Sequence, residues 1–184
     1  MIKKEMTTIL GSGLSGIGAM KLAIKKNIPI YLSDHSMISD ETKEFLFKNN
    51  IRYEEDGHNW DIISNSKEIV ISPGISSKMV VKHMPRFDKK NIVSEIEFAS
   101  RFTNSFIIAI TGSNGKTTTS FLIYDILKKA GLNVGIAGNM GKSFSESVAE
   151  NLFDYYVLEL SSFQLDDIEN FNPNISVILN ISKD

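Results

Sequence analysis

The residue types best suited to chemistry lie in one short run, residues 111–119, with the sequence TGSNGKTTT. Gly112 and Gly115 let the backbone turn tightly and bring N–H groups close to an anion. Lys116 is long enough to reach the β- and γ-phosphates of a nucleotide, and the Thr117 hydroxyl stands where such loops hold Mg²⁺. The run therefore predicts a phosphate-binding loop.

The segments on either side of this loop support the prediction. Residues 106–110 are apolar and rich in β-branched side chains, which is typical of a buried strand. A helix with an apolar face should follow the loop and add the positive end of its dipole to the anion site. That helix should place Leu122, Ile126 and Lys129 on one line and Ile123, Leu127 and Ala130 on the next. A plain glycine turn with a surface lysine is the alternative, and it does not account for the agreement of strand, loop and helix.

Composition limits the classes of function. The 184 residues are 42% hydrophobic and 23% charged, which is typical of a chain that buries a core. A net charge of −2 creates no field that favours nucleic acid or an anionic membrane, and no apolar run approaches membrane-spanning length. The absence of cysteine excludes thiolate catalysis and Cys-ligated zinc, and the three histidines lack metal-ligand spacing. We expect a cytoplasmic monomer without nucleic-acid or membrane partners.

The N-terminal part of the chain alternates strands and helices. Residues 7–10 predict a strand, a glycine-rich turn follows at residues 11–16, and a helix leads to a second strand that ends at Asp34. This is the βαβ arrangement of a dinucleotide fold, with G-x-G-x-x-G and an acidic residue at the next strand end. The pattern alone is weak, because it says only that a diphosphate fits at a helix N-terminus. The alternative of an NAD-dependent dehydrogenase depends on this pattern alone and does not explain the loop at residues 111–119.

Further elements follow before the phosphate loop. A helix is predicted over residues 40–48, and strands are predicted over residues 51–53, 68–71 and 91–93. The turn at 72–75 lies at the carboxyl end of a strand, where doubly wound sheets bind ligands, although a plain Pro-Gly turn is the simpler interpretation. We expect His58 at the surface and Trp60 in packing. Ser94 and Glu97 have the spacing of a helix N-cap and its third residue.

Three features follow the phosphate loop. Residues 138–143 repeat its G-x-x-G-K-[ST] spacing after another strand-like run, and we predict that only the first loop holds ATP, with Lys142 solvated. A strand over residues 154–160 carries Glu159 near its carboxyl end, the position of a Walker-B acid that binds Mg²⁺. An outward-facing glutamate is the alternative. Residues 175–181 predict a further buried strand.

The loop departs from the general G-x-x-x-x-G-K-[ST] pattern, because Ile110 stands where the first glycine would be. Its shorter form, T-G-x-N-G-K-T, resembles the superfamily of Mur ligases and folylpolyglutamate synthetases, which use ATP to make an amide through an acyl phosphate. Four stretches, in the family's order, are similar to the Mur ligases that add D-glutamate to UDP-N-acetylmuramoyl-L-alanine in peptidoglycan synthesis. They are residues 13–16 (GLSG), 72–75 (SPGI), 111–117 (TGSNGKT) and 158–165 (LELSSFQL).

The resemblance implies ATP and Mg²⁺ as cofactors, and a role for each matching residue. The residues that would bind ATP are Gly112, Ser113, Asn114, Gly115, Lys116, Thr117 and Thr118. Lys116 and Glu159 would be catalytic, while Thr117 and Glu159 would hold the metal. The residues that would contact the UDP-sugar are Leu14, Ser15, Asp34, Gly74, Asn139, Ser161 and Gln164. The N–H groups of residues 12–16 would bind its diphosphate.

The resemblance also implies an architecture. We expect an α/β protein, with a Rossmann-like UDP-binding domain over residues 1–93 and a truncated P-loop ATPase domain with a mostly parallel sheet over residues 94–184. The family's ligases continue with a histidine, a metal-bridging carbamylated lysine and a third domain, so this chain should be an N-terminal portion that is inactive alone. His35, Ser36 and Lys142 depart from the family's usual residues. Two alternatives stay open: a ligase for another amino acid, and a UDP-sugar-binding module without catalysis.

Overall fold

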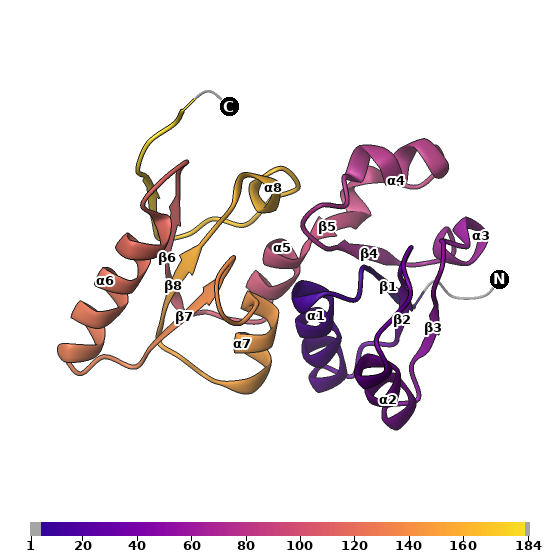
Figure 1. Cartoon of the computed structure of the whole chain (residues 1–184), viewed down its shortest axis with the longest axis horizontal. Coiled ribbons are helices and arrows are strands. Elements are labelled where there is room, and N and C mark those ends of the chain that lie inside the picture. Colours follow the sequence, from indigo (N-terminus) through magenta and orange to yellow (C-terminus); the bar gives the residue numbers. More distant parts are fainter. Residues whose placement is uncertain (1–4, 183–184) are drawn as a thin grey trace.

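The computed structural model describes residues 5–182, which form two sheets joined by a short helix (Figure 1). The first sheet has the strand order β3-β2-β1-β4-β5, and every pairing in it is parallel. This is the order of the dinucleotide-binding fold, in which ligands bind where the order reverses, here between β1 and β4. Its strands are β1 (Thr7–Leu10), β2 (Ile30–Ser33), β3 (Arg52–Glu54), β4 (Glu68–Ile71) and β5 (Ile92–Ser94).

The second sheet has the order β7-β8-β6-β9, and its pairings are also parallel. Its strands are β6 (Phe106–Thr111), β7 (Val134–Gly138), β8 (Tyr155–Glu159) and β9 (Ile175–Ile178). The expected α/β class with mainly parallel sheets is therefore confirmed. The prediction of a buried final strand is wrong, because within residues 5–182 β9 pairs with β6 alone and forms a mostly exposed edge.

Helices cover both sheets. They are α1 (Leu14–Lys25), α2 (Asp40–Lys48), α3 (Trp60–Ile63), α4 (Ser77–His83), η1 (Lys89–Asn91), α5 (Glu95–Ser100), α6 (Lys116–Lys129), α7 (Phe144–Glu150) and α8 (Ser162–Leu165). No helix within residues 5–182 combines the length and apolar character needed to cross a membrane. Helix α6 packs on the second sheet through Ile123 and Leu127, whereas Leu122 and Ile126 on the neighbouring line are exposed.

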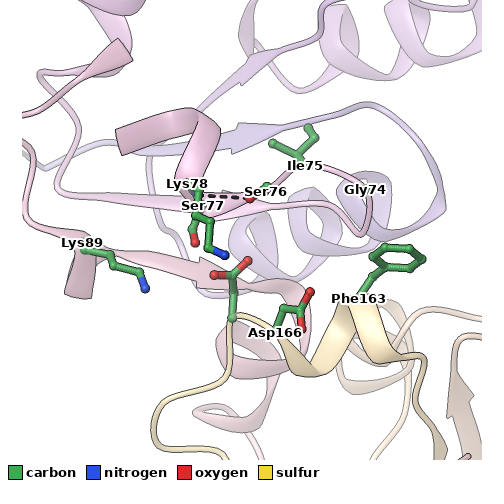
Figure 2. A pocket seen from close by; sticks show the side chains of 9 residues that line it. Gly74, Ile75, Ser76, Ser77, Lys78, Lys89, Phe163 and Asp166 are labelled. Atoms are coloured by element: carbon green, nitrogen blue, oxygen red, sulfur yellow. Dashed lines mark hydrogen bonds between the residues drawn. The ribbon is translucent and has the colours of Figure 1, made fainter. Parts of the chain in front are cut away.

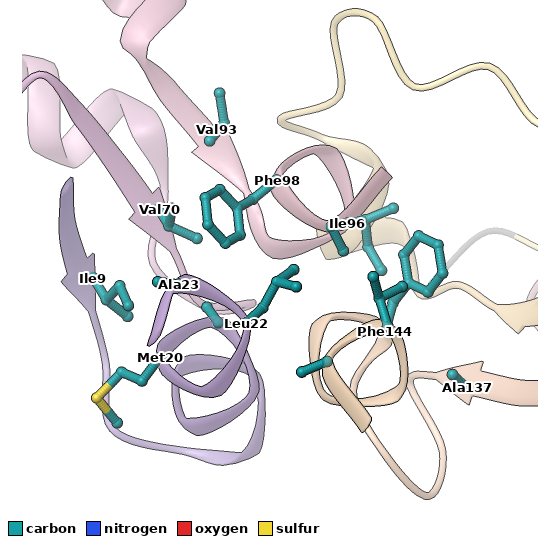
Figure 3. Packing of buried hydrophobic residues seen from close by; sticks show 14 of the residues in the cluster. Ile9, Met20, Leu22, Ala23, Val70, Val93, Ile96, Phe98, Ala137 and Phe144 are labelled. Carbon is teal, nitrogen blue, oxygen red and sulfur yellow. The ribbon is translucent and has the colours of Figure 1, made fainter. Parts of the chain in front are cut away.

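A single hydrophobic cluster runs from one sheet to the other. It contains Ile9 and Leu22 from the first sheet and its helix, Phe98 from α5, and Phe144 and Leu158 from the second unit. Figure 3 shows α5 between α1 and α7, with Ile96 and Phe98 directed to either side. Burial of apolar surface across this junction favours one fixed arrangement of the two sheets.

Helices α1 and α7 approach closely at this junction. A Cβ atom on Gly18 would lie 1.9 Å from the Ser143 hydroxyl, so only glycine fits there. Lys21 donates to Glu146 at 2.6 Å, and the Lys25 ammonium donates to the Ala149 carbonyl oxygen at 2.5 Å. The side of α1 that carries lysines in the sequence therefore faces the second unit.

Helix α5 also holds the segment after α8 through a buried carboxylate. Glu97 is 1% exposed, and its Oε2 accepts the backbone N–H groups of Glu169, Asn170 and Phe171 at 3.2, 3.0 and 2.8 Å. Ser94 caps the helix by accepting the Glu97 N–H, as its spacing predicted. The Glu97 side chain thus satisfies three backbone donors that follow α8, a contact that sequence spacing did not predict.

Replacing Glu97 with glutamine should destabilise the fold by about 1–2 kcal/mol, because a neutral amide oxygen is a weaker acceptor for three donors than a carboxylate. The loss should be measured by urea unfolding, and cleavage within residues 166–173 by limited proteolysis should become faster. Glu169→Gln, an exposed position in the same segment, is the control and should change neither quantity. Equal effects of the two substitutions would contradict the anchoring role.

Candidate functional site

The phosphate loop lies between β6 and α6, as the sequence predicted. Gly112 and Gly115 have φ values of +146° and +84°, which residues other than glycine rarely adopt. The Lys116 ammonium donates to the carbonyl oxygens of Gly112 and Ser113 at 2.6 and 3.1 Å, so the lysine lies over its own loop. The loop thus presents a cation and a helix N-terminus at the same place.

Asn180 binds the phosphate loop from the other side, which sequence reasoning missed. Its Oδ1 accepts the Asn114 N–H at 2.9 Å, its carbonyl oxygen accepts the Ser113 N–H at 3.0 Å, and its Nδ2 donates to the Asn114 carbonyl at 3.0 Å. The N–H groups of Ser113 and Asn114 are therefore engaged within the protein. An anion would therefore be bound by N–H groups in the part of the loop nearer to α6.

Glu159 ends β8 beside the phosphate loop and is 3% exposed. Its Oε2 accepts the Thr117 hydroxyl at 2.8 Å, and its Oε1 accepts the Asn139 amide at 3.0 Å. Asn139 also donates its backbone N–H to the Glu159 carbonyl at 2.8 Å. The structure thus brings together residues from the first glycine loop, the second glycine loop and the strand between them. The alternative of an outward-facing glutamate does not hold.

The oxygen atoms at this point fit a hard cation. Glu159 supplies a carboxylate and Thr117 a hydroxyl, which are ligand types that Mg²⁺ takes while keeping several waters and substrate phosphates. Within residues 5–182 no group of three or more His, Cys, Asp or Glu side chains forms a metal site of protein ligands alone. The donor set therefore suits a metal that arrives with a nucleotide.

The second glycine loop, residues 138–143, leads into a shorter helix than the first loop does. Ser143 caps α7 by accepting the Glu146 N–H at 3.2 Å, and α7 is only seven residues long. The Lys142 side chain is 52% exposed, as expected for a solvated lysine, and it also forms an ion pair with Glu150 that the sequence did not predict. Lys142 is held on the outer side of the loop by that pair, whereas Asn139 faces Glu159.

Asp34 lies at the carboxyl end of β2, next to the first glycine loop. Its Oδ2 accepts the Ser12 N–H and hydroxyl at 2.6 and 2.7 Å, and its Oδ1 accepts the Ser36 N–H at 2.8 Å. Burial by itself would raise the pKa of Asp34, but the hydrogen bonds from Ser12 and Ser36 outweigh it and lower the pKa. Asp34 therefore stays ionised, and the Ser12 N–H is already engaged.

The other residues expected at the UDP-sugar lie around the same edge of the sheet. Leu14 is 70% exposed at the start of α1, Ser15 is half-buried beside it, and Gly74 adopts a φ of +98° in the turn after β4. Because β1 and β4 are neighbours, these loops meet at the reversal of strand order. The structure thus brings Leu14, Ser15, Asp34 and Gly74 to one end of the first sheet.

The expected surface position of His58 is wrong. The ring is half-buried, and its Nδ1 lies 2.6 Å from the Ser33 hydroxyl, which donates to Glu54 at 2.7 Å. Burial lowers the pKa of His58. Trp60 begins α3 and stacks on His83 with ring centroids 4.5 Å apart, which agrees with its expected packing role.

Ser161 and Gln164 form a capping box at α8. The Gln164 Oε1 accepts the Ser161 N–H at 3.0 Å, and the Ser161 hydroxyl accepts the Gln164 N–H at 3.3 Å. Gln164 is 3% exposed, so its side chain serves the helix start, whereas Ser161 is half-buried. The pattern S-x-x-Q could have revealed this local role from sequence.

A pocket of about 330 Å³ separates α8 from the turn after β4 (Figure 2). Phe163 and Asp166 line it from the α8 side, and Gly74, Ile75 and Lys78 line it from the first unit. In Figure 2 the Phe163 ring faces the Gly74 turn across the opening. The two units therefore share an open recess next to Gly74, one of the residues expected to bind the UDP-sugar.

Comparison with known proteins finds two domain models that match separate parts of the chain. The family model for the MurD N-terminal domain matches residues 7–81, and the model for the Mur ligase middle domain matches residues 110–184. The UDP-N-acetylmuramoylalanine–D-glutamate ligases of Bacteroides thetaiotaomicron and Porphyromonas gingivalis are 49% and 48% identical to this chain over 176 residues. These alignments cover 96% of this chain but 40% and 39% of the relatives, so the chain spans about two fifths of their length.

Solved structures show the same fold at low identity. A UDP-N-acetylmuramate:L-alanyl-γ-D-glutamyl-meso-diaminopimelate ligase from Neisseria meningitidis aligns with a TM-score of 0.59 and 18% identity, over 98% of this chain and 61% of that one. A UDP-N-acetylmuramate–alanine ligase from Thermotoga maritima aligns with a TM-score of 0.55 and 20% identity, over 97% of this chain and 42% of that one. Together the two domain models account for most of the sequence. The chain therefore belongs to the Mur ligase family, in which it matches the N-terminal domain and the middle domain.

Proposed function

We propose that this chain is the UDP-sugar- and ATP-binding portion of a cytoplasmic, monomeric ligase that adds D-glutamate to UDP-N-acetylmuramoyl-L-alanine in peptidoglycan synthesis. The observation that carries the proposal is the contact of Glu159 with both Thr117 and Asn139 beside the phosphate loop. We divide the chain into a UDP-sugar domain over residues 1–93 and the first part of an ATP-binding domain over residues 94–184. The relatives' names and the two matched domain types support this assignment.

The reaction would proceed in two steps. The substrate carboxylate attacks the γ-phosphorus of ATP, which gives an acyl phosphate and releases ADP. The amine of D-glutamate then attacks the acyl carbon, forms the amide and expels phosphate. Positioning and neutralisation of charge supply most of the rate of phosphoryl transfer, so residues that hold the phosphates dominate the first step.

In this scheme Lys116 leaves the carbonyl oxygens of its own loop to contact the β- and γ-phosphates. The residues that would bind ATP are Gly112, Ser113, Asn114, Gly115, Lys116, Thr117 and Thr118. Thr117 and Glu159 would hold Mg²⁺, which when bound neutralises charge on the transferred phosphoryl group. Because Asn180 engages the N–H groups of Ser113 and Asn114, these two residues would act through the shape of the loop or through Ser113's side chain.

The UDP-sugar would extend from the first glycine loop toward Glu159. Leu14, Ser15, Asp34 and Gly74 would bind its UDP moiety, with Asp34 ionised and ordering Ser12. Asn139, Ser161 and Gln164 would line the path of the muramoyl group. Asn139 is the residue of these three that touches Glu159, and it would link the sugar site to the metal site.

Calorimetric titration of this chain with UDP-N-acetylmuramoyl-L-alanine, and then with ATP and Mg²⁺, tests the proposal. We expect saturable binding of the UDP-sugar, weaker binding of ATP, and no ligation when D-glutamate is added. UDP-glucose and UDP should bind more weakly, because they lack the muramoyl group. A chain that shows a cooperative thermal unfolding transition but binds no UDP-sugar would disprove the proposal.

Two outcomes of the same titration separate the other functions. UDP-sugar binding without any ATP binding would favour a binding module without catalysis. In a longer protein that includes the rest of the relatives' length, ligation of an amino acid other than D-glutamate would identify a different ligase of the superfamily.

A further inference from the structure

Glu95 is a buried carboxylic acid at the junction of the two units. It is the first residue of α5 and is 2% exposed. Its Oε1 accepts the backbone N–H of Ser145 in α7, and the Ser145 hydroxyl donates to the Glu95 carbonyl oxygen at 3.4 Å. The carboxyl group therefore links the helix between the two sheets to the start of α7.

The second oxygen of this carboxyl group has no hydrogen-bond partner among residues 5–182. The same holds for the buried hydroxyl of Ser72, which follows β4. Both residues line one cavity of about 10 Å³, together with Pro73, Ser94 and Gln164. Ile71, Ile75 and Phe163 form apolar parts of its wall. A cavity of this size has room for about one water molecule, and buried polar groups without a protein partner are usually satisfied by such a water.

Ser72 connects this cavity to the first glycine loop. Its hydroxyl packs against Gly11 and Gly16, where an added Cβ would lie 2.8 and 3.5 Å from it. Ser72 also begins the turn that carries Gly74, and its carbonyl oxygen accepts the Ile75 N–H at 3.0 Å. A constraint on the Ser72 hydroxyl therefore acts on both loops at the reversal of strand order.

Charged neighbours do not compensate a negative charge on Glu95. The charged groups on the elements around it are engaged elsewhere. Arg101, which follows α5, pairs with Glu68 and Glu97, and the Glu97 carboxylate also binds the N–H groups after α8. On α7, Glu146 pairs with Lys21 of α1 and Glu150 pairs with Lys142. Asp167 is the other acidic residue that lines the cavity, and the turn at 72–75 has no ionisable side chain. Burial raises the pKa of Glu95 to about 7, and the hydrogen bonds from Ser145 oppose this only in part.

We propose that Glu95 is a positioning residue for the UDP-sugar site. The neutral carboxyl group of Glu95 donates a hydrogen bond to one buried water, which in turn contacts the Ser72 hydroxyl. This bridge fixes the two loops of the first sheet against α7. The expected effect on binding rests on the proposed UDP-sugar site, whereas the protonation state of Glu95 does not depend on it. Ionisation of Glu95 replaces this donor with an uncompensated charge, and the loops lose their common anchor.

The pH dependence of stability arises from the same group. An unfolded glutamate titrates near pH 4.5, so between that value and about 7 the folded protein binds one proton more than the unfolded chain. Glu95 therefore contributes stability at low pH that is lost as the pH rises to about 7. Ionisation should also weaken UDP-sugar binding, because only the neutral form holds the loops in place.

The first test observes Glu95 without any nucleotide. In this chain labelled with ¹³C at glutamate side-chain carboxyl groups, NMR should show one carboxyl resonance that titrates near pH 7 and is missing in Glu95→Gln. Replacement of exposed Glu41 by glutamine is the control and should leave the resonance near pH 7 in place. A Glu95 resonance that titrates near 4.5 would overturn the proposal, whatever the chain binds.

The second test measures the affinity for UDP-N-acetylmuramoyl-L-alanine by calorimetry at pH 6 and pH 8. The neutral fraction of Glu95 falls from about 0.9 to about 0.1 over this interval, so the affinity of the unmodified chain should fall about tenfold. Glu95→Gln keeps a neutral donor of similar shape and should bind with less than about twofold change between the two pH values. Glu41→Gln should retain the tenfold change.

The outcomes of these tests separate the two proposals. Equal pH dependence in Glu95→Gln and in the unmodified chain would overturn the role of Glu95 and leave the UDP-sugar site intact. Absence of binding at both pH values would count against the proposed function, while the NMR titration would still decide the state of Glu95. Should Glu95→Gln unfold, Ser72→Ala removes the other side of the water bridge and should shift the Glu95 resonance.

Discussion

Replacement of Lys116 by alanine should lower the rate of ATP-dependent ligation about 10³-fold, in a protein that joins this chain to the remaining length of its relatives. The ammonium is the cation of the phosphate loop, at the N-terminus of α6, and alanine supplies no charge to the phosphates. The measurement is phosphate release that depends on both UDP-N-acetylmuramoyl-L-alanine and D-glutamate. Affinity for the UDP-sugar should change much less than the rate does, because the residues proposed to bind its UDP moiety lie at the other sheet.

The second glycine loop provides a matched control for this prediction. Lys142 has the same position in a G-x-x-G-K-[ST] pattern, but it pairs with Glu150 at the surface. Lys142→Ala should reduce ligation by less than about threefold, in line with the small contribution of exposed ion pairs. Near-normal activity of Lys116→Ala together with an inactive Lys142→Ala would assign ATP to the second loop.

Replacement of Gly138 by alanine should destabilise the chain by about 3–4 kcal/mol, as judged by urea unfolding. Gly138 ends β7 with a φ of +112°, and an added Cβ would lie 2.2 Å from the Glu159 carbonyl oxygen. That oxygen already accepts the Asn139 N–H at 2.8 Å. The methyl group must therefore displace the loop, whose Asn139 contacts Glu159, or the end of β8, which carries Glu159 itself.

Gly141 in the same loop separates steric conflict from backbone strain. Its φ is +72°, and an added Cβ would meet no atom within 4 Å. Gly141→Ala should therefore cost only about 1 kcal/mol, the usual penalty for a side chain at positive φ. Similar losses of stability in the two variants would show that the approach of Gly138 to Glu159 is not tight.

Local patterns were enough to predict most elements of the fold. Alternating apolar runs and glycine turns gave the strands at residues 7–10 and 68–71 and the helix at residues 40–48 with the bounds that the structure has. The spacing of Ser94 and Glu97 correctly gave a helix N-cap. These features depend on neighbours within a few residues, which the sequence displays directly.

Predictions that depended on the environment of a side chain were less accurate. Residues 175–181 are as apolar as an inner strand, yet β9 lies at the sheet edge, because strand order rather than composition decides which faces are covered. The line of Leu122 and Ile126 on α6 is equally apolar and stays exposed. His58 looked like a surface residue and instead contacts Ser33, which is 25 positions away.

By itself, the sequence determined the glycine-rich loop between a strand and a helix at residues 111–119, the alternation of strands and helices, and the four stretches that resemble the Mur ligases, because each depends on contiguous residues. Only the tertiary structure decided that Glu159 meets Thr117 and Asn139, 42 and 20 positions away, and that Asn180 engages the N–H groups of the loop. It also placed Glu95 and Ser72 on one small cavity. Such contacts arise from strand order and from packing between the two sheets, which no local pattern encodes.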